Sequence, residues 1–232
     1  MVEHYAEDYS LIMGIVDLIP VALFALAGCI IIKELFDKLR KPFAVLMCSG
    51  VTLSLTAGVF KAVWKILLSL NICDFYPFDV MFMPTQALGL ALMGVGLISL
   101  LFEKKEKGVA TTNAIALPLL FIIFASTPAK QVDGNIAFIA MLVIGELMIA
   151  VSMSYLAIKN KNWISLPLFI VYSIALIVMG AMKPLSTKLS MSVTTANWVE
   201  ESINIVAQGC LLAGCYLLSK KGFMAFKAKS EQ

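Results

Sequence analysis

Long apolar runs, separated by short polar segments, dominate this chain of 232 residues. A bilayer core about 30 Å thick needs roughly 20 mostly apolar residues per helix, which is the length scale of these runs. They are too long for barrel strands, and a helix satisfies its backbone polar groups within one segment. The pattern predicts an all-α polytopic membrane protein with seven transmembrane helices. The predicted spans are 11–32, 43–70, 81–102, 110–125, 136–158, 163–182 and 198–218.

The composition agrees with this pattern, because 60% of the residues are apolar and 14% are charged. An ordinary soluble domain has about 45–50% apolar and about 25% charged residues. Seven spans leave only short loops, so we expect one transmembrane domain over residues 1–232. Glu3, Glu7 and Asp8 stand where a signal peptide would have a basic start, which predicts that the first span is retained.

The charges of the loops alternate along the chain, and most of the 18 basic residues lie on one predicted side. Basic loop residues resist crossing the membrane during insertion. The N-terminus is therefore predicted outside and the C-terminus in the cytoplasm, with the chain in the cell membrane. The basic loop residues on the cytoplasmic side are Lys33, Lys38, Arg40, Lys41, Lys104, Lys105, Lys107, Lys159, Lys161, Lys220, Lys221, Lys227 and Lys229.

A faint internal repeat relates the first three spans to the last three. Gly58 and Lys61 near the end of the second span resemble Gly180 and Lys183 near the end of the sixth. Two copies in the same orientation need one extra crossing between them, which the short fourth span would supply. We therefore expect half-bundles 11–102 and 136–218 joined by a linker helix, 110–125, with chance similarity as the alternative. The further matched pairs are Gly89 with Gly209, Gly94 with Gly214, and more loosely Asp17 with Glu146.

Several charged and amide side chains fall inside the predicted spans. A charge at a bilayer centre costs roughly 2.5 to 3.5 kcal/mol on insertion scales, so such residues usually pair, face a cavity or have a function. Glu201, Asn204 and Gln208 share one helical stripe, and Lys61 and Lys65 share another. This predicts a mixed-charge cavity that opens outward between spans one, two, five and seven. The candidate solute-binding residues are Asp17, Lys61, Lys65, Gln86, Glu146, Glu201, Asn204 and Gln208.

Structural roles are the alternatives for these residues. Asp17 and Lys61 could form a salt bridge without binding anything, and Trp64 fits an anchor at the membrane interface. The chain has five cysteines without a CxxC spacing and a single histidine, His4, so we expect no metal and no cofactor.

Seven spans, an outside N-terminus and a three-plus-one-plus-three arrangement resemble the SWEET and PQ-loop transporters. This resemblance implies two triple-helix bundles around a central substrate site. It concerns organisation only, because the family's proline–glutamine pair is absent and the closest string is Pro84-Thr85-Gln86.

These observations favour a small transporter or permease for a small polar or zwitterionic solute. A seven-helix receptor or sensory subunit and a membrane-embedded enzyme remain alternatives, although no GxSxG, HExxH or phosphate-loop motif is present. The expected partners are the lipid bilayer and a small-molecule ligand, with no nucleic acid, and self-association is left open.

Overall fold

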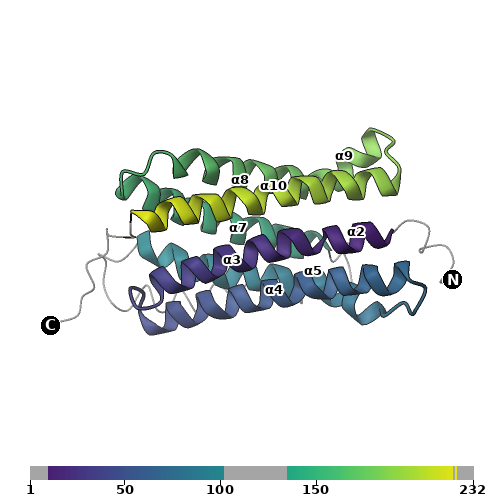
Figure 1. The fold of residues 1–232 in the computed structure, drawn as a ribbon, viewed down its shortest axis with the longest axis horizontal. Coiled ribbons are helices and arrows are strands. Elements are labelled where there is room, and N and C mark those ends of the chain that lie inside the picture. The colour runs from purple at the N-terminus through teal and green to yellow at the C-terminus, as the bar shows by residue number, and fades with distance from the viewer. Residues whose placement is uncertain (1–9, 102–134, 222, 224–232) are drawn as a thin grey trace.

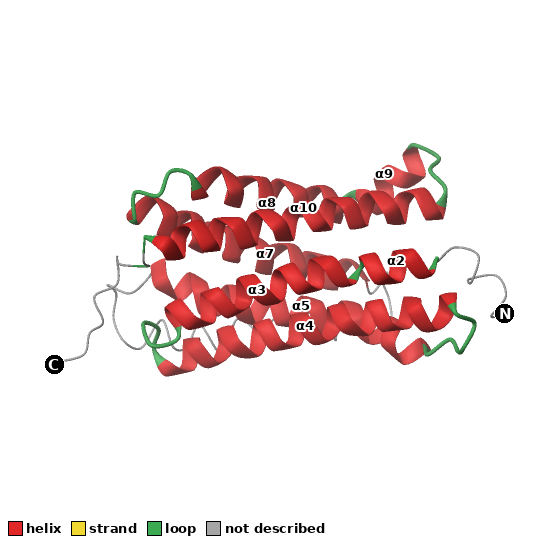
Figure 2. Ribbon diagram, in the orientation of Figure 1, coloured by secondary structure: helices red, strands yellow, loops and turns green. Residues whose placement is uncertain are grey.

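The computed structural model describes residues 10–101, 135–221 and 223, without the side chains of 135–137, 183 and 184. Every regular element in these ranges is a helix, and the long helices lie side by side (Figures 1 and 2). This confirms the all-α class. The helices are α2 Leu11–Val16, α3 Leu18–Leu35, α4 Lys41–Ser69, α5 Tyr76–Ile98, η1 Ser99–Leu101, α7 Asn135–Lys159, α8 Ser165–Gly180, α9 Met182–Lys188 and α10 Val193–Lys220.

Five helical stretches in the described ranges are long and apolar enough to cross a membrane. The predicted sixth span, 163–182, is shorter than expected, since α8 has only 16 residues. The predicted fourth span, 110–125, lies outside the described residues. The five stretches are Leu11–Leu35, Lys41–Ser69, Tyr76–Leu101, Phe138–Lys159 and Val193–Lys220.

Prolines account for two interruptions that the apolar runs do not reveal. Pro20 has no amide hydrogen for the carbonyl four residues earlier, and the first span divides at Asp17 into α2 and α3. Pro184 has the same effect on Gly180, where α8 ends before α9 begins. The first predicted span is therefore one helical stretch with an interruption at Asp17, whose backbone remains in the right-handed helical region.

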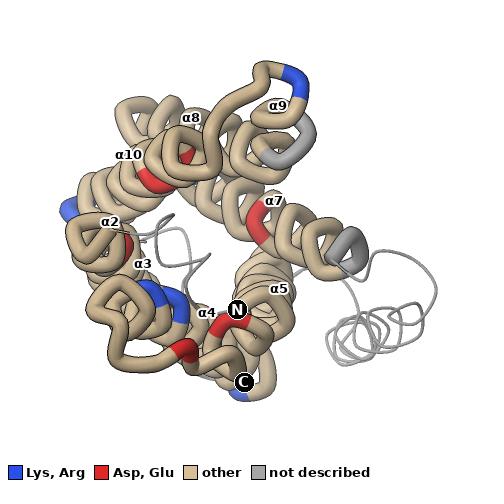
Figure 3. Tube along the Cα trace, turned by 90° about the vertical axis from the view of Figure 1, so that its right-hand side faces the viewer, with Lys and Arg blue, Asp and Glu red and all other residues tan. Residues whose placement is uncertain are grey.

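The described long helices form a closed ring. In the order α3, α4, α5, α7, α8 and α10, each helix contacts the next, and α10 contacts α3. Figure 3, which looks along the helices, shows this ring. Each helix packs against two neighbours, so one face of every helix is directed to the ring interior.

The directions of the helices repeat after three members of the ring. At the junction of α5 and α7 the chains run parallel, because Leu90 faces Gly145 and Gly94 faces Met148. The junction of α10 and α3 is parallel too, as Figure 1 shows. The remaining neighbours are antiparallel, so a shift of three helices maps α3, α4 and α5 onto α7, α8 and α10 with matching directions.

One predicted repeat pair occupies equivalent places in this ring. A Cβ atom added to Gly58 would meet Val21, and one added to Gly180 would meet Val143. Val143 follows Val21 in the sequence by the same number of residues as Gly180 follows Gly58. The α3–α4 and α7–α8 contacts therefore share one local arrangement.

The two glycines of the predicted match Gly94 and Gly214 have different neighbours. A Cβ atom on Gly94 would meet α7, whereas one on Gly214 would meet Phe169 of α8. Gly96, which faces Met47 of α4, has surroundings more like those of Gly214, because α4 and α8 occupy matching places in the ring. Gly214 follows Gly96 by fewer residues than Gly180 follows Gly58, so one sequence offset does not relate both pairs.

Small residues bring α4 and α5 into close contact. A Cβ atom added to Gly89 would lie 2.5 Å from Ser54 Oγ and 2.7 Å from Ser54 N. A Cβ atom added to Gly50 would meet the backbone of Met93 and would lie 2.5 Å from Gly89 O. Close backbone approach of this kind is how small residues stabilise helix pairs in membranes.

We expect Gly50→Ala to lower the melting temperature of the protein in detergent, with a loss of about 1–3 kcal/mol from overpacking. Gly209→Ala is the matched control, because a Cβ atom there has nothing within 4 Å. Equal melting temperatures for the two variants would contradict the close α4–α5 contact.

Candidate functional site

Three buried side chains form an ion-pair cluster where α2 and α3 meet. Lys65 Nζ on α4 lies 2.6 Å from Asp17 Oδ2 and 3.2 Å from Glu201 Oε1 on α10. The side chains of Lys65, Asp17 and Glu201 are 3%, 4% and 4% exposed. The cluster joins three helical elements, and it places Asp17 at the interruption caused by Pro20.

Lys61 extends this cluster toward the ring interior. Its Nζ lies 3.4 Å from Glu201 Oε1 and 4.9 Å from the centre of the Phe82 ring. The Lys61 side chain is 29% exposed, unlike that of Lys65. Of the two lysines, Lys61 is therefore the one available to an entering solute.

A cavity of about 100 Å³ lies inside the ring beside this cluster. Seven of the eight predicted site residues line it, and the eighth, Lys65, reaches the site through its ion pairs. The lining residues are Asp17, Pro20, Val21, Phe24, Ser54, Leu55, Gly58, Lys61, Phe82, Gln86, Leu90, Leu142, Glu146, Met179, Glu201, Asn204 and Gln208.

The wall formed by α5, α7 and α10 carries the acceptor groups. Glu146 is 6% exposed, and its Oε2 is buried without a hydrogen-bond partner among the described residues. Gln208 donates from Nε2 to Asn204 Oδ1 at 3.4 Å, while its own Oε1 is buried without a partner in the described part of the chain. The lysines of the cavity thus lie on α4, and the unpaired carboxylate and amide oxygens lie on α5, α7 and α10.

Two expectations about side-chain contacts and exposure differ from the structure. The alternative of an Asp17–Lys61 salt bridge is wrong, since Asp17 pairs with Lys65 and Lys61 with Glu201. Trp64 is 8% exposed, and its Nε1 donates to Asp74 Oδ1 at 2.9 Å, which differs from an exposed interface anchor.

Some lining residues could not be recognised from charge alone. Ser54 and Gly58 precede Lys61 and Lys65 on α4 at spacings of four, three and four residues, which place all of them on one helical face. That spacing was an available signal. Phe24, Phe82 and Met179 gave none, because apolar residues are found on every face of these helices.

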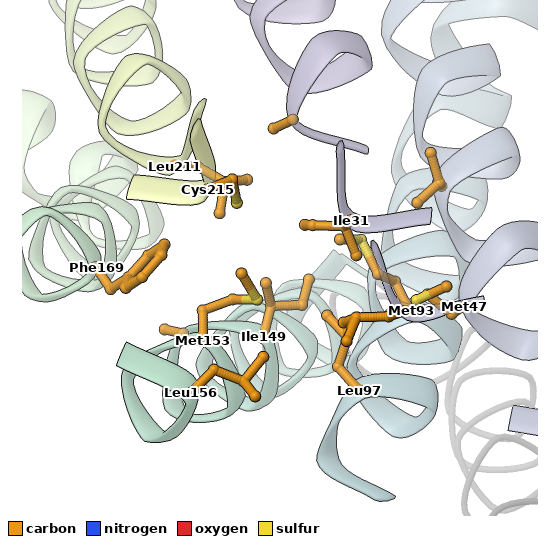
Figure 4. Packing of buried hydrophobic residues seen from close by; sticks show 14 of the residues in the cluster. Ile31, Met47, Met93, Leu97, Ile149, Met153, Leu156, Phe169, Leu211 and Cys215 are labelled. Carbon is orange, nitrogen blue, oxygen red and sulfur yellow. The ribbon is translucent and has the colours of Figure 1, made fainter. Parts of the chain in front are cut away.

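Apolar side chains fill the ring beyond the cavity. Along α3, α5, α7 and α10 they come after the residues that line the cavity, and along α4 and α8 they come before them, so they occupy the opposite end of the bundle. Figure 4 shows members from all six ring helices directed toward one another. They include Ile31, Met47, Met93, Leu97, Ile149, Met153, Phe169, Leu211 and Cys215, all buried.

These features define a class: in its described residues the protein is all-helical, with five membrane-length apolar helices and a charged cluster between them. Comparison with protein-family models, curated proteins and solved structures gave no match for the chain. The resemblance to SWEET and PQ-loop transporters therefore rests on helix organisation alone.

Proposed function

We propose that the protein is a small-solute transporter or permease that binds a small polar or zwitterionic solute in the 100 Å³ cavity. The observation that carries this proposal is a mixed-charge cavity above an apolar core within one helical ring. Alternating access requires a solute site at one end of the bundle and a closed barrier at the other end.

The interrupted helices support the same function. Transporter sites are commonly built at breaks in transmembrane helices, where the local backbone and side chains can face a solute. Asp17 lies between α2 and α3, where the helix is interrupted for one residue, and α8 ends at Gly180 next to the cavity residue Met179. These junctions are also places where a helix can bend during a conformational change.

We further propose that the chain has seven spans in a three-plus-one-plus-three arrangement, with the cavity on the pseudo-twofold axis of the two halves. Asn204 follows Gln86 in the sequence by the same number of residues as Gly214 follows Gly96. Gln86 and Asn204 both line the cavity. The paired positions support a site shared between two related half-bundles, with residues 110–125 as the linking span.

Uptake by liposomes containing the purified protein tests the transport proposal. We expect accumulation of at least one labelled small zwitterion or amine from a panel, above the level of protein-free liposomes. If no solute or ion gradient moves while the protein is folded and inserted, transport is excluded, and a receptor that only binds the solute becomes the better account.

Thiol labelling tests the proposed orientation. Cys73 is exposed in the loop between α4 and α5, which we place outside the cell membrane. We expect an impermeant maleimide to label Cys73 in intact cells. A cysteine introduced by Asn160→Cys should react only after the cells are opened, and the reverse order of labelling would overturn the orientation.

A further inference from the structure

Glu146 has no partner of opposite charge among the residues that the structure describes. None of the ion pairs among the described residues involves it, although it is 6% exposed and lines the cavity. An ionised carboxylate removed from water is costly unless it is paired or hydrogen-bonded. Among the described residues, the Glu146 carboxylate thus has no compensating positive charge, whereas the carboxylates of Asp17 and Glu201 are paired with Lys65.

Three neutral oxygens share this deficit. Within the described ranges, Gln86 Oε1, Gln208 Oε1 and Ser54 Oγ are buried without hydrogen-bond partners, and their residues line the same cavity. Ser54 and Gln208 are 3% and 8% exposed. Together with Glu146, these residues bring unpaired oxygens from α4, α5, α7 and α10 to one partly open cavity.

An aromatic ring completes this set. Phe24 on α3 lines the cavity and is 6% exposed. The ring order places α3 and α7 three helices apart, so Phe24 and Glu146 belong to opposite walls. An ammonium group is favoured both by carboxylate and amide oxygens and by the face of an aromatic ring.

The cavity has room for a small ligand. An apolar cavity of about 150 Å³ holds benzene. A cavity of about 100 Å³ therefore accommodates a solute of a few non-hydrogen atoms. The described residues contain no group of three or more His, Cys, Asp or Glu able to hold a metal ion.

We propose that this cavity binds a small primary amine, with its ammonium group held by the Glu146 carboxylate and by the amide oxygens of Gln86 and Gln208. If the amine also carries a carboxylate, Lys61 on α4 is the matching cation. The proposal deepens the transport function by naming the charge of the solute, and it rests on that function only for the movement of the solute.

Binding of labelled methylammonium to the purified full-length protein in lipid nanodiscs tests the proposal without any need for transport. We expect saturable binding that weakens at least tenfold in Glu146→Gln. Gln208→Leu should weaken it severalfold. Glu34→Gln is the control, because Glu34 pairs with Lys38 away from the cavity and should leave the binding unchanged.

Several results would overturn the amine site. These are unchanged binding in Glu146→Gln, equal displacement of methylammonium by sodium, and no binding by the folded wild type. Gel filtration and melting temperature establish folding for each variant. Glu146→Gln removes a buried charge, so we expect it to fold.

The same variants separate this inference from the transport proposal. Methylammonium binding without uptake into liposomes would exclude transport and leave the amine site standing. Uptake of a solute that is equally fast in Glu146→Gln would exclude the amine site and leave transport standing.

Discussion

Lys65→Met is expected to be the most destabilising single substitution at the site. Lys65 is the ion-pair partner of Asp17 among the described residues, and both side chains are almost fully buried. Removing one member of a buried pair leaves an uncompensated charge, which costs about 3–5 kcal/mol. We expect a large fall in melting temperature in detergent and a smaller folded fraction in gel filtration.

A second substitution should reverse most of this loss. In Lys65→Met, Glu201 keeps Lys61 at 3.4 Å, but Asp17 loses its ion pair. The double variant Lys65→Met, Asp17→Asn removes the uncompensated charge and should recover most of the melting temperature. Lys33→Met, at an exposed lysine, serves as the control. A double variant no more stable than Lys65→Met would show that the charge pairing is not what stabilises this junction.

Lys61→Met should have the opposite profile, with a large effect on uptake and a small effect on stability. Lys61 is 29% exposed and lines the cavity, while Glu201 retains Lys65 at 3.2 Å when Lys61 is lost. A partly exposed ion pair contributes only about 0.2–1 kcal/mol. We expect uptake of a zwitterionic solute in liposomes to fall at least tenfold, with a nearly unchanged melting temperature.

The control for this experiment is Lys61→Arg, which keeps the positive charge and should retain part of the uptake. If Lys61→Met transports at the wild-type rate, Lys61 does not contact the solute. The evidence for solute binding in the cavity would then come only from the unpaired oxygens on α5, α7 and α10.

The helical fold could be predicted from the sequence, because apolar runs of membrane length have few other solutions. Their exact ends and interruptions could not. Pro20 was visible in the first span, yet its effect depends on which carbonyl loses a donor and on how neighbouring helices accommodate the break. The end of α8 at Gly180 likewise lies four residues before Pro184, where the sequence also becomes more polar.

The candidate site was partly predictable for a related reason. Charges inside apolar runs are rare and costly, so Asp17, Lys61, Glu146 and Glu201 attract attention at once. Their pairing was not predictable, since Lys61 and Lys65 share one helical face and helix rotation decides which of them meets Asp17. Apolar lining residues such as Phe24 acquire significance only when the ring order places them across from a charge.

An experimental structure of the protein in lipid nanodiscs with methylammonium present tests the central claim most directly. The account predicts that Asp17, Lys61, Glu146 and Glu201 face one cavity, with non-protein density in contact with the Glu146 carboxylate. A dry, collapsed ring interior, with Glu146 directed to another surface and no density beside it, would contradict the account.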